Sequence, residues 1–247
     1  MSIERMSGTP PPAEAPPGLA TGDSAVPVAV RLQILSTEHW SLLATRSLTW
    51  NESFSRSSMF LSALSGAVVA LALVAQASAF GEAFVVFSLV LLPVVFFLGF
   101  GTYVRLVQAN LEDARWVSGM NRLRHAYLEI APELEPYFIT GSHDDETGLV
   151  VTAAAVGQHA AAMPRSTSVL YGLSTTPVTV GVIDSVVGAV LVGVIAGRLQ
   201  VSMVPSVMLG VAAFLVIFAS MAAYYFRAYR VFRRVNRPRF PTPGPGE

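Results

Sequence analysis

Four stretches of the chain are apolar and almost free of charge over the roughly 20 residues that a membrane-spanning helix needs. That length follows from a hydrocarbon core about 30 Å thick and a helix rise of 1.5 Å per residue. Buried helices of soluble proteins seldom run as far without a charge. The pattern therefore predicts membrane spans over residues 58–80, 83–103, 178–197 and 203–226.

The composition agrees with a membrane protein that crosses the bilayer several times. Of the 247 residues, 53% are hydrophobic and 13% are charged, whereas soluble domains contain about 25% charged residues. The mean hydropathy is +0.55. We predict an all-α polytopic membrane protein with four transmembrane helices and a small helical cytoplasmic layer.

Arginines are distributed unevenly among the segments that flank the spans. The segments before the first span, between the second and third, and after the fourth contain four, five and six arginines. The other two loops contain none and one. The positive-inside rule places the arginine-rich segments in the cytoplasm, so we predict a bacterial inner-membrane protein with both termini cytoplasmic.

The polar segments predict helices as well as disorder. The second span is expected to continue as one long helix over 84–129, ended by Pro132 and Pro136. A further helix is expected over 144–163, with Ser142 and Asp145 at capping-box spacing. The helix before the first span either lies in the membrane interface or packs on the middle segment. The predicted segments are a disordered Pro-rich arm (1–27), an interfacial or cytoplasmic helix (28–56), a transmembrane hairpin (57–105), a cytoplasmic helical segment (106–176), a second hairpin (177–227) and a basic, then Pro/Gly-rich tail (228–247), disordered from residue 237.

One run of the middle segment carries a resemblance to known proteins. The run from Met120 to Phe138, MNRLRHAYLEIAPELEPYF, is followed by His143-Asp144-Asp145. It resembles a family of uncharacterised bacterial four-span membrane proteins, which implies the same span layout and no particular activity. The first half of the chain is also similar in layout to the two-span effectors of bacterial nucleotide-triggered defence systems, although the second pair of spans departs from that layout.

Two of the predicted spans carry small residues at every fourth position. Such rows form a flat face that lets another helix backbone approach closely, and in lipid this packing drives association. The rows are expected either to join spans one and three within one chain or to join copies of the chain. The row in span three is Gly181, Ser185, Ala189, Gly193 and Gly197, and the row in span one is Ser58, Ser62, Gly66 and Ala70.

Asp184 is the only charged residue inside a predicted span. It lies between Gly181 and Gly188 on one side of the helix, which predicts that it faces the bundle interior. Ionisable residues in this position often mark ion or proton pathways. The alternative is a structural carboxylate paired with Arg105, Arg165 or a serine of the first span.

Two further residues extend the possible intramembrane ion site. Ser185 follows Asp184 directly, and Pro93 interrupts the hydrogen-bond ladder of the second span. A carbonyl freed by proline can bind a cation in transporters, although most such prolines only bend a helix.

The remaining chemistry argues against an enzyme. The chain has no cysteine and no lysine, which excludes thiolate metal sites and Schiff-base chemistry. The acidic run at 143–146 fits a helix start better than a metal site, and His39, His125 and His159 have no partner at ligand spacing. We predict no cofactor, no metal and, at zero net charge, no nucleic-acid partner. The tail arginines expected to bind anionic lipid headgroups are Arg227, Arg230, Arg233 and Arg234.

These observations favour an oligomerising membrane scaffold or accessory subunit without catalytic activity. Its partners would be further copies of the chain or another component of a membrane complex. One alternative is an ion channel or small transporter that uses Asp184. A further alternative is a pore-forming effector of the defence type.

Overall fold

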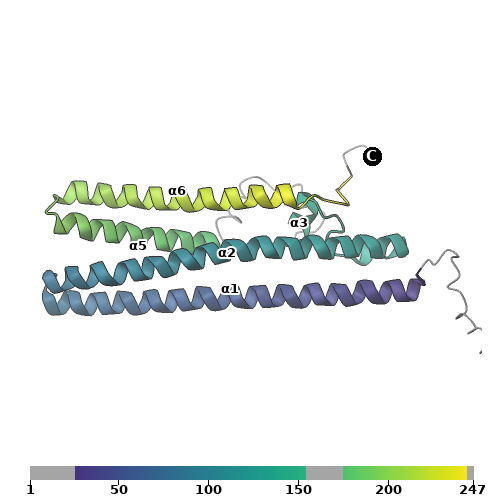
Figure 1. Ribbon diagram of the computed structural model, residues 1–247, viewed down its shortest axis with the longest axis horizontal. Coiled ribbons are helices and arrows are strands. Elements are labelled where there is room, and N and C mark those ends of the chain that lie inside the picture. Colours follow the sequence, from purple (N-terminus) through teal and green to yellow (C-terminus); the bar gives the residue numbers. More distant parts are fainter. Residues whose placement is uncertain (1–25, 154–174, 244–247) are drawn as a thin grey trace, which may run out of the picture.

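The computed structural model describes residues 26–153 and 175–243, and within these ranges it consists of helices and irregular connections without strands (Figure 1). Four of its helices are long and apolar enough to cross a membrane. The prediction of an all-α, multi-pass membrane protein is therefore confirmed. The elements are α1 (Val28–Ser78), α2 (Glu82–Ile130), the 3-10 helix η1 (Pro132–Tyr137), α3 (Glu146–Ala153), α5 (Thr176–Arg198) and α6 (Met203–Val235).

The long helices form two hairpins that pack side by side (Figure 1). Helices α1 and α2 are antiparallel, as are α5 and α6, and both tight turns lie at the same end of the molecule. Helix α2 is the central element, because it packs on α1 along one side and on α5 along another. It also contacts η1, α3 and α6.

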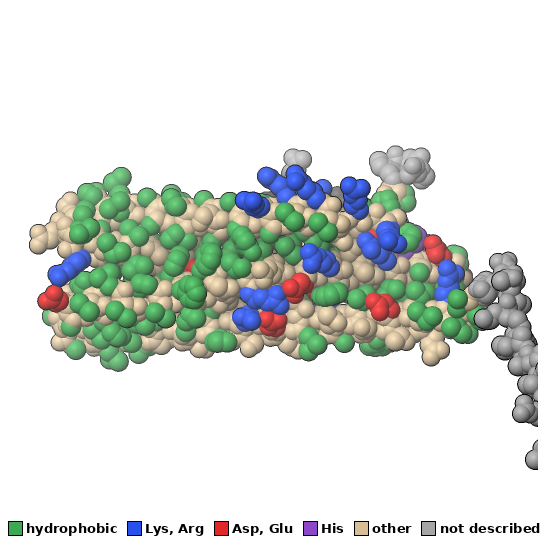
Figure 2. Space-filling model, viewed as in Figure 1, with side chains coloured by type: hydrophobic (Ala, Val, Ile, Leu, Met, Phe, Trp, Pro, Cys, Tyr) green, Lys and Arg blue, Asp and Glu red, His purple; other side chains and the backbone are tan. Residues whose placement is uncertain are grey.

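Charge is sharply separated along the molecule (Figure 2). On α2, 22 uncharged residues lie between Glu82 and Arg105 and rise about 33 Å, close to the thickness of a hydrocarbon core. We call this layer, in which Asp184 is the one acidic or basic side chain among the described residues, the apolar band. At the hairpin tips Arg198 pairs with Glu82 at 3.1 Å, and most of the other charged side chains on this face are spread from the middle of the molecule to its right-hand end. The band comprises residues 57–78, 83–104, 177–197 and 203–226.

Beyond the apolar band, α1 and α2 continue together as a two-helix stalk, which comprises residues 28–56 and 105–130. The Arg46 guanidinium donates to Asp113 at 2.6 Å, and the His39 ring stacks on Tyr127. The stalk part of α1 is continuous with its span. The predicted long extension of the second span is thus confirmed, and the alternative of a helix lying in the membrane plane before span one is wrong.

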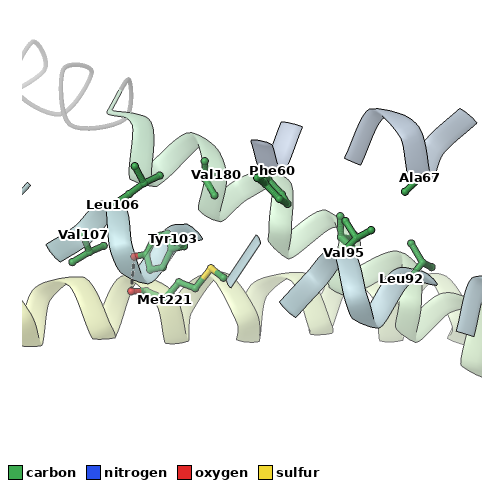
Figure 3. Packing of buried hydrophobic residues seen from close by; sticks show 10 residues of the cluster. Phe60, Ala67, Leu92, Val95, Tyr103, Leu106, Val107, Val180 and Met221 are labelled. Carbon is green, nitrogen blue, oxygen red and sulfur yellow. Dashed lines mark hydrogen bonds between the residues drawn. The ribbon is translucent and has the colours of Figure 1, made fainter. Parts of the chain in front are cut away.

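The core of the band joins all four long helices (Figure 3). Tyr103 is buried, and its hydroxyl donates a hydrogen bond of 2.7 Å to the backbone carbonyl of Met221. This bond fixes α2 against α6 inside an apolar layer, where an unpaired hydroxyl would be costly. The buried hydrophobic residues around it include Phe60, Ala67, Leu92, Val95, Leu106, Val107 and Val180.

An ion-pair network marks the border between the band and the stalk. Glu52 on α1 accepts hydrogen bonds from Arg105 on α2 at 2.8 Å and from Arg56 at 2.9 Å. Arg105 also donates to Glu112 at 2.8 Å. The bonds from Arg105 and Arg56 lower the pKa of Glu52 to about 2. The network therefore fixes the register of α1 against α2 where the helices leave the band.

The Glu52 network predicts a dependence of stability on pH. A carboxyl whose pKa is lowered by folding stabilises the folded state above its ordinary pKa of about 4.5 and loses that contribution as the pH falls toward about 2. Glu52→Gln should lower the melting temperature at neutral pH and flatten its decline between about pH 5 and pH 3. The measurement is thermal unfolding in detergent, with Glu38→Gln on the exposed face of the same helix as the control. Equal slopes for wild type and Glu52→Gln would show that the network contributes nothing.

Candidate functional site

Asp184 lies inside the apolar band, on the face of α5 that is directed into the bundle. It is eight residues, or about 12 Å, from the first residue of α5. The residue is 0% exposed. Among the described residues, neither carboxyl oxygen has a hydrogen-bond partner. The predicted orientation toward the bundle interior is therefore confirmed.

Gly99 on α2 provides the space that the Asp184 carboxyl occupies. A Cβ atom at position 99 would collide with the Asp184 carboxyl group and would lie 2.8 Å from the Phe60 ring. Only glycine therefore lets α2 approach α1 and α5 this closely. Sequence reasoning missed Gly99, because a glycine in an uninterrupted apolar run gives no sign of what faces it.

The partners predicted for Asp184 bind elsewhere. Arg105 is engaged by Glu52 and Glu112, so the expected pairing with Arg105 is wrong. On α1, Ser58 and Ser62 lie on the exposed side. Arg165 lies outside the described residues.

The other two residues of the predicted ion site are not gathered around the carboxyl. The Ser185 hydroxyl donates to the Gly181 carbonyl of its own helix at 2.6 Å. Pro93 lies within α2, six residues from Gly99, which corresponds to about 9 Å along the axis. Among the described residues, Asp184 is thus a single carboxyl rather than part of a cluster of ligands.

The small-residue row of α5 divides into a packed half and an open half. A Cβ at Gly181 would meet the Tyr103 ring at 3.2 Å, and Ser185 is fully buried. The carbonyl of Ala189 lies 3.4 Å from the position of a Cβ on Gly210 of α6. Gly193 and Gly197 instead line an apolar groove of about 640 Å³ between α5 and α6. A Cβ atom added at either glycine would have no neighbour within 4 Å.

The small-residue row of α1 faces away from the rest of the bundle. Ser58, Ser62 and Gly66 are exposed and Ala70 is half-buried. A Cβ added at Gly66 would also meet nothing within 4 Å. The rows on α1 and α5 therefore do not pack on each other within the chain, contrary to the intramolecular alternative.

A second polar centre holds the C-terminal segment against the stalk. The fully buried Asp144 carboxylate accepts hydrogen bonds from the Arg122 guanidinium at 2.6 Å and from the backbone amides of Arg239 and Phe240 at 2.9 and 2.8 Å. Next to it, Asp145 accepts from the amide and hydroxyl of Thr242 at 3.0 and 2.9 Å. We call Asp144, Asp145 and residues 237–242 the tail clasp.

The clasp corrects one expectation. The sequence predicts disorder from residue 237 onward, but the backbone bonds to Asp144 and Asp145 hold 239–242 against the loop before α3. The ring of His125 also stacks on Phe240, with ring centroids 4.2 Å apart. These contacts join parts of the chain that are far apart in sequence.

Hydrogen bonding governs the protonation of the clasp. Burial alone would raise the pKa of Asp144, but the amides of Arg239 and Phe240 and the Arg122 guanidinium outweigh burial and hold it below the usual range. In the same way, the amides of Gly148 and Thr242 outweigh burial and lower the pKa of Asp145. Both groups are therefore carboxylates at neutral pH, as acceptors of backbone amides require.

The loop before α3 is organised by a cap and a buried amide. Asp145 caps α3 by accepting a 2.9 Å hydrogen bond from the Gly148 amide, so this helix begins at Glu146 instead of at residue 144. The buried Asn121 side chain donates to the carbonyls of His143 and Gly148. The described residues contain no group of three side chains able to hold a metal ion. The expected continuation of this helix to residue 163 lies outside the described residues.

The arginines predicted to contact lipid headgroups follow the apolar part of α6. Arg227, Arg230 and Arg234 are exposed, while Arg233 pairs with Glu146 of α3 at 3.1 Å. Arg227 is the first charged residue after the band on this helix. Within the part of the chain that the structure describes, three of the four thus make no ion pair and can face a membrane surface.

Comparisons of the chain with protein-family models, with curated proteins and with solved structures give no match. The features that bear on function are therefore those of the chain itself: the enclosed carboxyl of Asp184, the two open small-residue rows and the tail clasp.

Removing the Asp144 carboxylate should release the C-terminal segment. Asp144→Ala leaves Arg122 and two backbone amides without their acceptor, and it should destabilise the docked tail by about 2–4 kcal/mol. Trypsin should then cut between Arg239 and Phe240, a bond that the clasp protects in the wild type. Glu146→Ala, which removes the exposed pair with Arg233 and the hydrogen bond from the Tyr229 hydroxyl but leaves Asp144 intact, is the matched control. Equal cleavage rates in wild type and Asp144→Ala would contradict the role of the clasp.

Proposed function

We propose that the protein is an oligomeric membrane scaffold whose copies associate through the two open small-residue rows. The observation that carries this proposal is that the α1 row and the Gly193–Gly197 half of the α5 row are left open, although each row has the residue pattern of a helix interface. Within lipid the hydrophobic effect does not drive helices together, so the favourable free energy of association has to come from close packing at small residues. Rows left open by the single chain are the surfaces on which such packing remains possible.

The two rows lie at overlapping depths on opposite edges of the bundle. Phe60, Gly99 and Asp184 meet at one level. Counted from this level toward the hairpin tips, the α1 row from Ser62 to Ala70 covers about 3–15 Å, and the α5 row from Ala189 to Gly197 covers about 8–20 Å. Because the two rows are different surfaces at similar depth, the α1 row of one copy can pack on the α5 row of the next in a head-to-tail contact. Such contacts close into a ring when the rotation between successive copies allows it.

The stalk supports a role in holding partners together. Trp40 is 71% exposed and Leu48 is 69% exposed. Trp40 lies 16 residues, or about 24 Å, beyond Arg56, too far from the band for its ring to sit among lipid headgroups. An exposed apolar side chain at this distance is suited to contact with protein, either the stalk of a neighbouring copy or another component. The arginine distribution favours a cytoplasmic stalk in a bacterial inner membrane.

The absence of native cysteine allows a direct test of the head-to-tail contact. Ala70→Cys and Gly193→Cys lie about 15 and 14 Å from the common level, so the two chains should form a disulfide-linked dimer when they are mixed in lipid and oxidised, because a disulfide needs Cα atoms within about 7 Å. Neither variant alone should cross-link. Val90→Cys, at an exposed position of α2 about 14 Å from the same level, replaces Ala70→Cys in the control mixture and should give no dimer. Cross-linking of Ala70→Cys alone would indicate a symmetric contact instead.

Bulky side chains in the rows should weaken the oligomer without unfolding the chain. Gly66→Leu and Gly193→Leu place side chains in open space, so the monomer should melt within about 0.5 kcal/mol of wild type, as surface changes usually do. Native mass spectrometry from lipid nanodiscs should show smaller species for both variants and unchanged species for Gly101→Leu. Wild-type protein that is only monomeric, with no co-purifying partner, would overturn the proposed function.

An ion channel or small transporter is the second candidate, and the unpartnered carboxyl of Asp184 favours it. If this candidate holds, proteoliposomes containing wild-type protein should pass ions and Asp184→Asn should change that flux. Intact oligomers without flux would remove the channel and leave the scaffold in place.

A further inference from the structure

Asp184 is enclosed by three helices of the apolar band. Its carboxyl lies against the Gly99 position of α2, next to the Phe60 ring of α1. Asp184 and Phe60 are 0% and 2% exposed. An ionised carboxylate in this position would lack both water and a counter-charge, and such a group is among the most costly to bury.

The polar groups near Asp184 are committed to other partners. The Ser185 hydroxyl donates to the Gly181 carbonyl, and the Tyr103 hydroxyl donates to the Met221 carbonyl. The nearest charged and titratable groups on the packed helices lie toward the stalk or at the hairpin tips. Toward the stalk they are Glu52 and Arg56 on α1, Tyr103 and Arg105 on α2, and Tyr224 and Tyr225 on α6. At the tips Glu82 of α2 and Arg198 of α5 pair with each other.

This arrangement selects among the possible ligands of a carboxyl group. Among hard metal cations, Ca²⁺ requires six to eight oxygen ligands, and Mg²⁺ requires six oxygens in near-octahedral geometry. Within the described chain, Asp184 supplies two oxygens and the neighbouring Ser185 hydroxyl, already bonded to the Gly181 carbonyl, adds at most one more, far fewer than these ions require. A proton needs a single oxygen and no further ligand. We propose that Asp184 is a proton-binding site, and that the closed bundle holds it as the neutral acid.

Proton release at this site is linked to the packing of α5 on α2. The neutral acid is compatible with the enclosed position beside Gly99, whereas the carboxylate gains its solvation only where water can reach it. Loss of the proton therefore favours a conformation in which α5 moves away from α2, and closure favours proton uptake, because the two equilibria are reciprocal. This inference requires neither the oligomer nor ion conduction.

A hydrophobic carbodiimide tests the site in the intact protein. Dicyclohexylcarbodiimide enters the bilayer and reacts with protonated carboxyls. The acid transfers its proton to one nitrogen of the reagent while its oxygen bonds to the central carbon, and the adduct rearranges to a stable N-acylurea that retains every atom of both reactants. At about pH 7 an ordinary aspartate is ionised and unreactive. Peptide mass spectrometry of lipid-reconstituted wild type should find the adduct on Asp184.

Two variants test whether the adduct is on Asp184, and added salt tests whether a proton or a metal cation occupies the site. Asp184→Asn should lose the adduct completely, and Glu82→Gln, which removes a carboxyl at the exposed tip, should retain it. The infrared carbonyl band of a protonated carboxyl should be present in wild type and absent in Asp184→Asn. An unlabelled Asp184 in folded wild type without that band would overturn the proposal. Suppression of the label by sodium or potassium at constant pH would also overturn it, because a metal cation would then occupy the carboxylate.

Discussion

Inside the apolar band, which is about 33 Å thick, the backbone has no water to bond with. Each amide and carbonyl must therefore find its hydrogen-bond partner within its own helix. That constraint produces the four long helices, and it also decides how the few polar side chains behave. The hydroxyls of Ser88 and Ser185 bond to carbonyls one turn back in their own helices. Tyr103 reaches across to α6. Asp184 is the exception, because its carboxyl oxygens have no hydrogen-bond partner among the described residues.

Outside this layer the same chain uses ordinary protein chemistry. Salt bridges such as Arg46–Asp113 hold the stalk helices together, and the buried carboxylate of Asp144 gathers a guanidinium and two amides. Partly exposed pairs of the first kind contribute little energy each. These pairs instead fix the register of the two helices, since a shift of one helix along the other breaks several pairs at once. The stalk therefore transmits a fixed alignment to the spans that continue from it.

The sequence was sufficient to predict the spans, because apolar length alone determines them, and the inward direction of Asp184, because glycines flank it on the same side. It was insufficient for the contacts that give each residue its role. Gly99 faces Asp184 only because α2 and α5 run antiparallel at one particular register, and no local pattern encodes a register. The tail clasp joins residues nearly 100 positions apart, and a proline-rich segment of that composition is typical of disorder when read alone. The small-residue rows were visible, but which of their members pack inside the chain depends on the arrangement of the helices.

The tail clasp also has a mechanical consequence. Helix α6 is tied to α2 at its stalk end by the clasp, whereas at its opposite end the exposed Arg198–Glu82 pair joins the second hairpin to α2. A rod about 50 Å long that is fixed at one end pivots about that end and does not slide. Any separation of the second hairpin from α2 would therefore be smallest beside the clasp and largest at the tips. Asp184 lies at the level of Ile217 to Met221, about halfway along the rod, and would experience about half of that opening, while the groove at Gly193 and Gly197 would travel furthest.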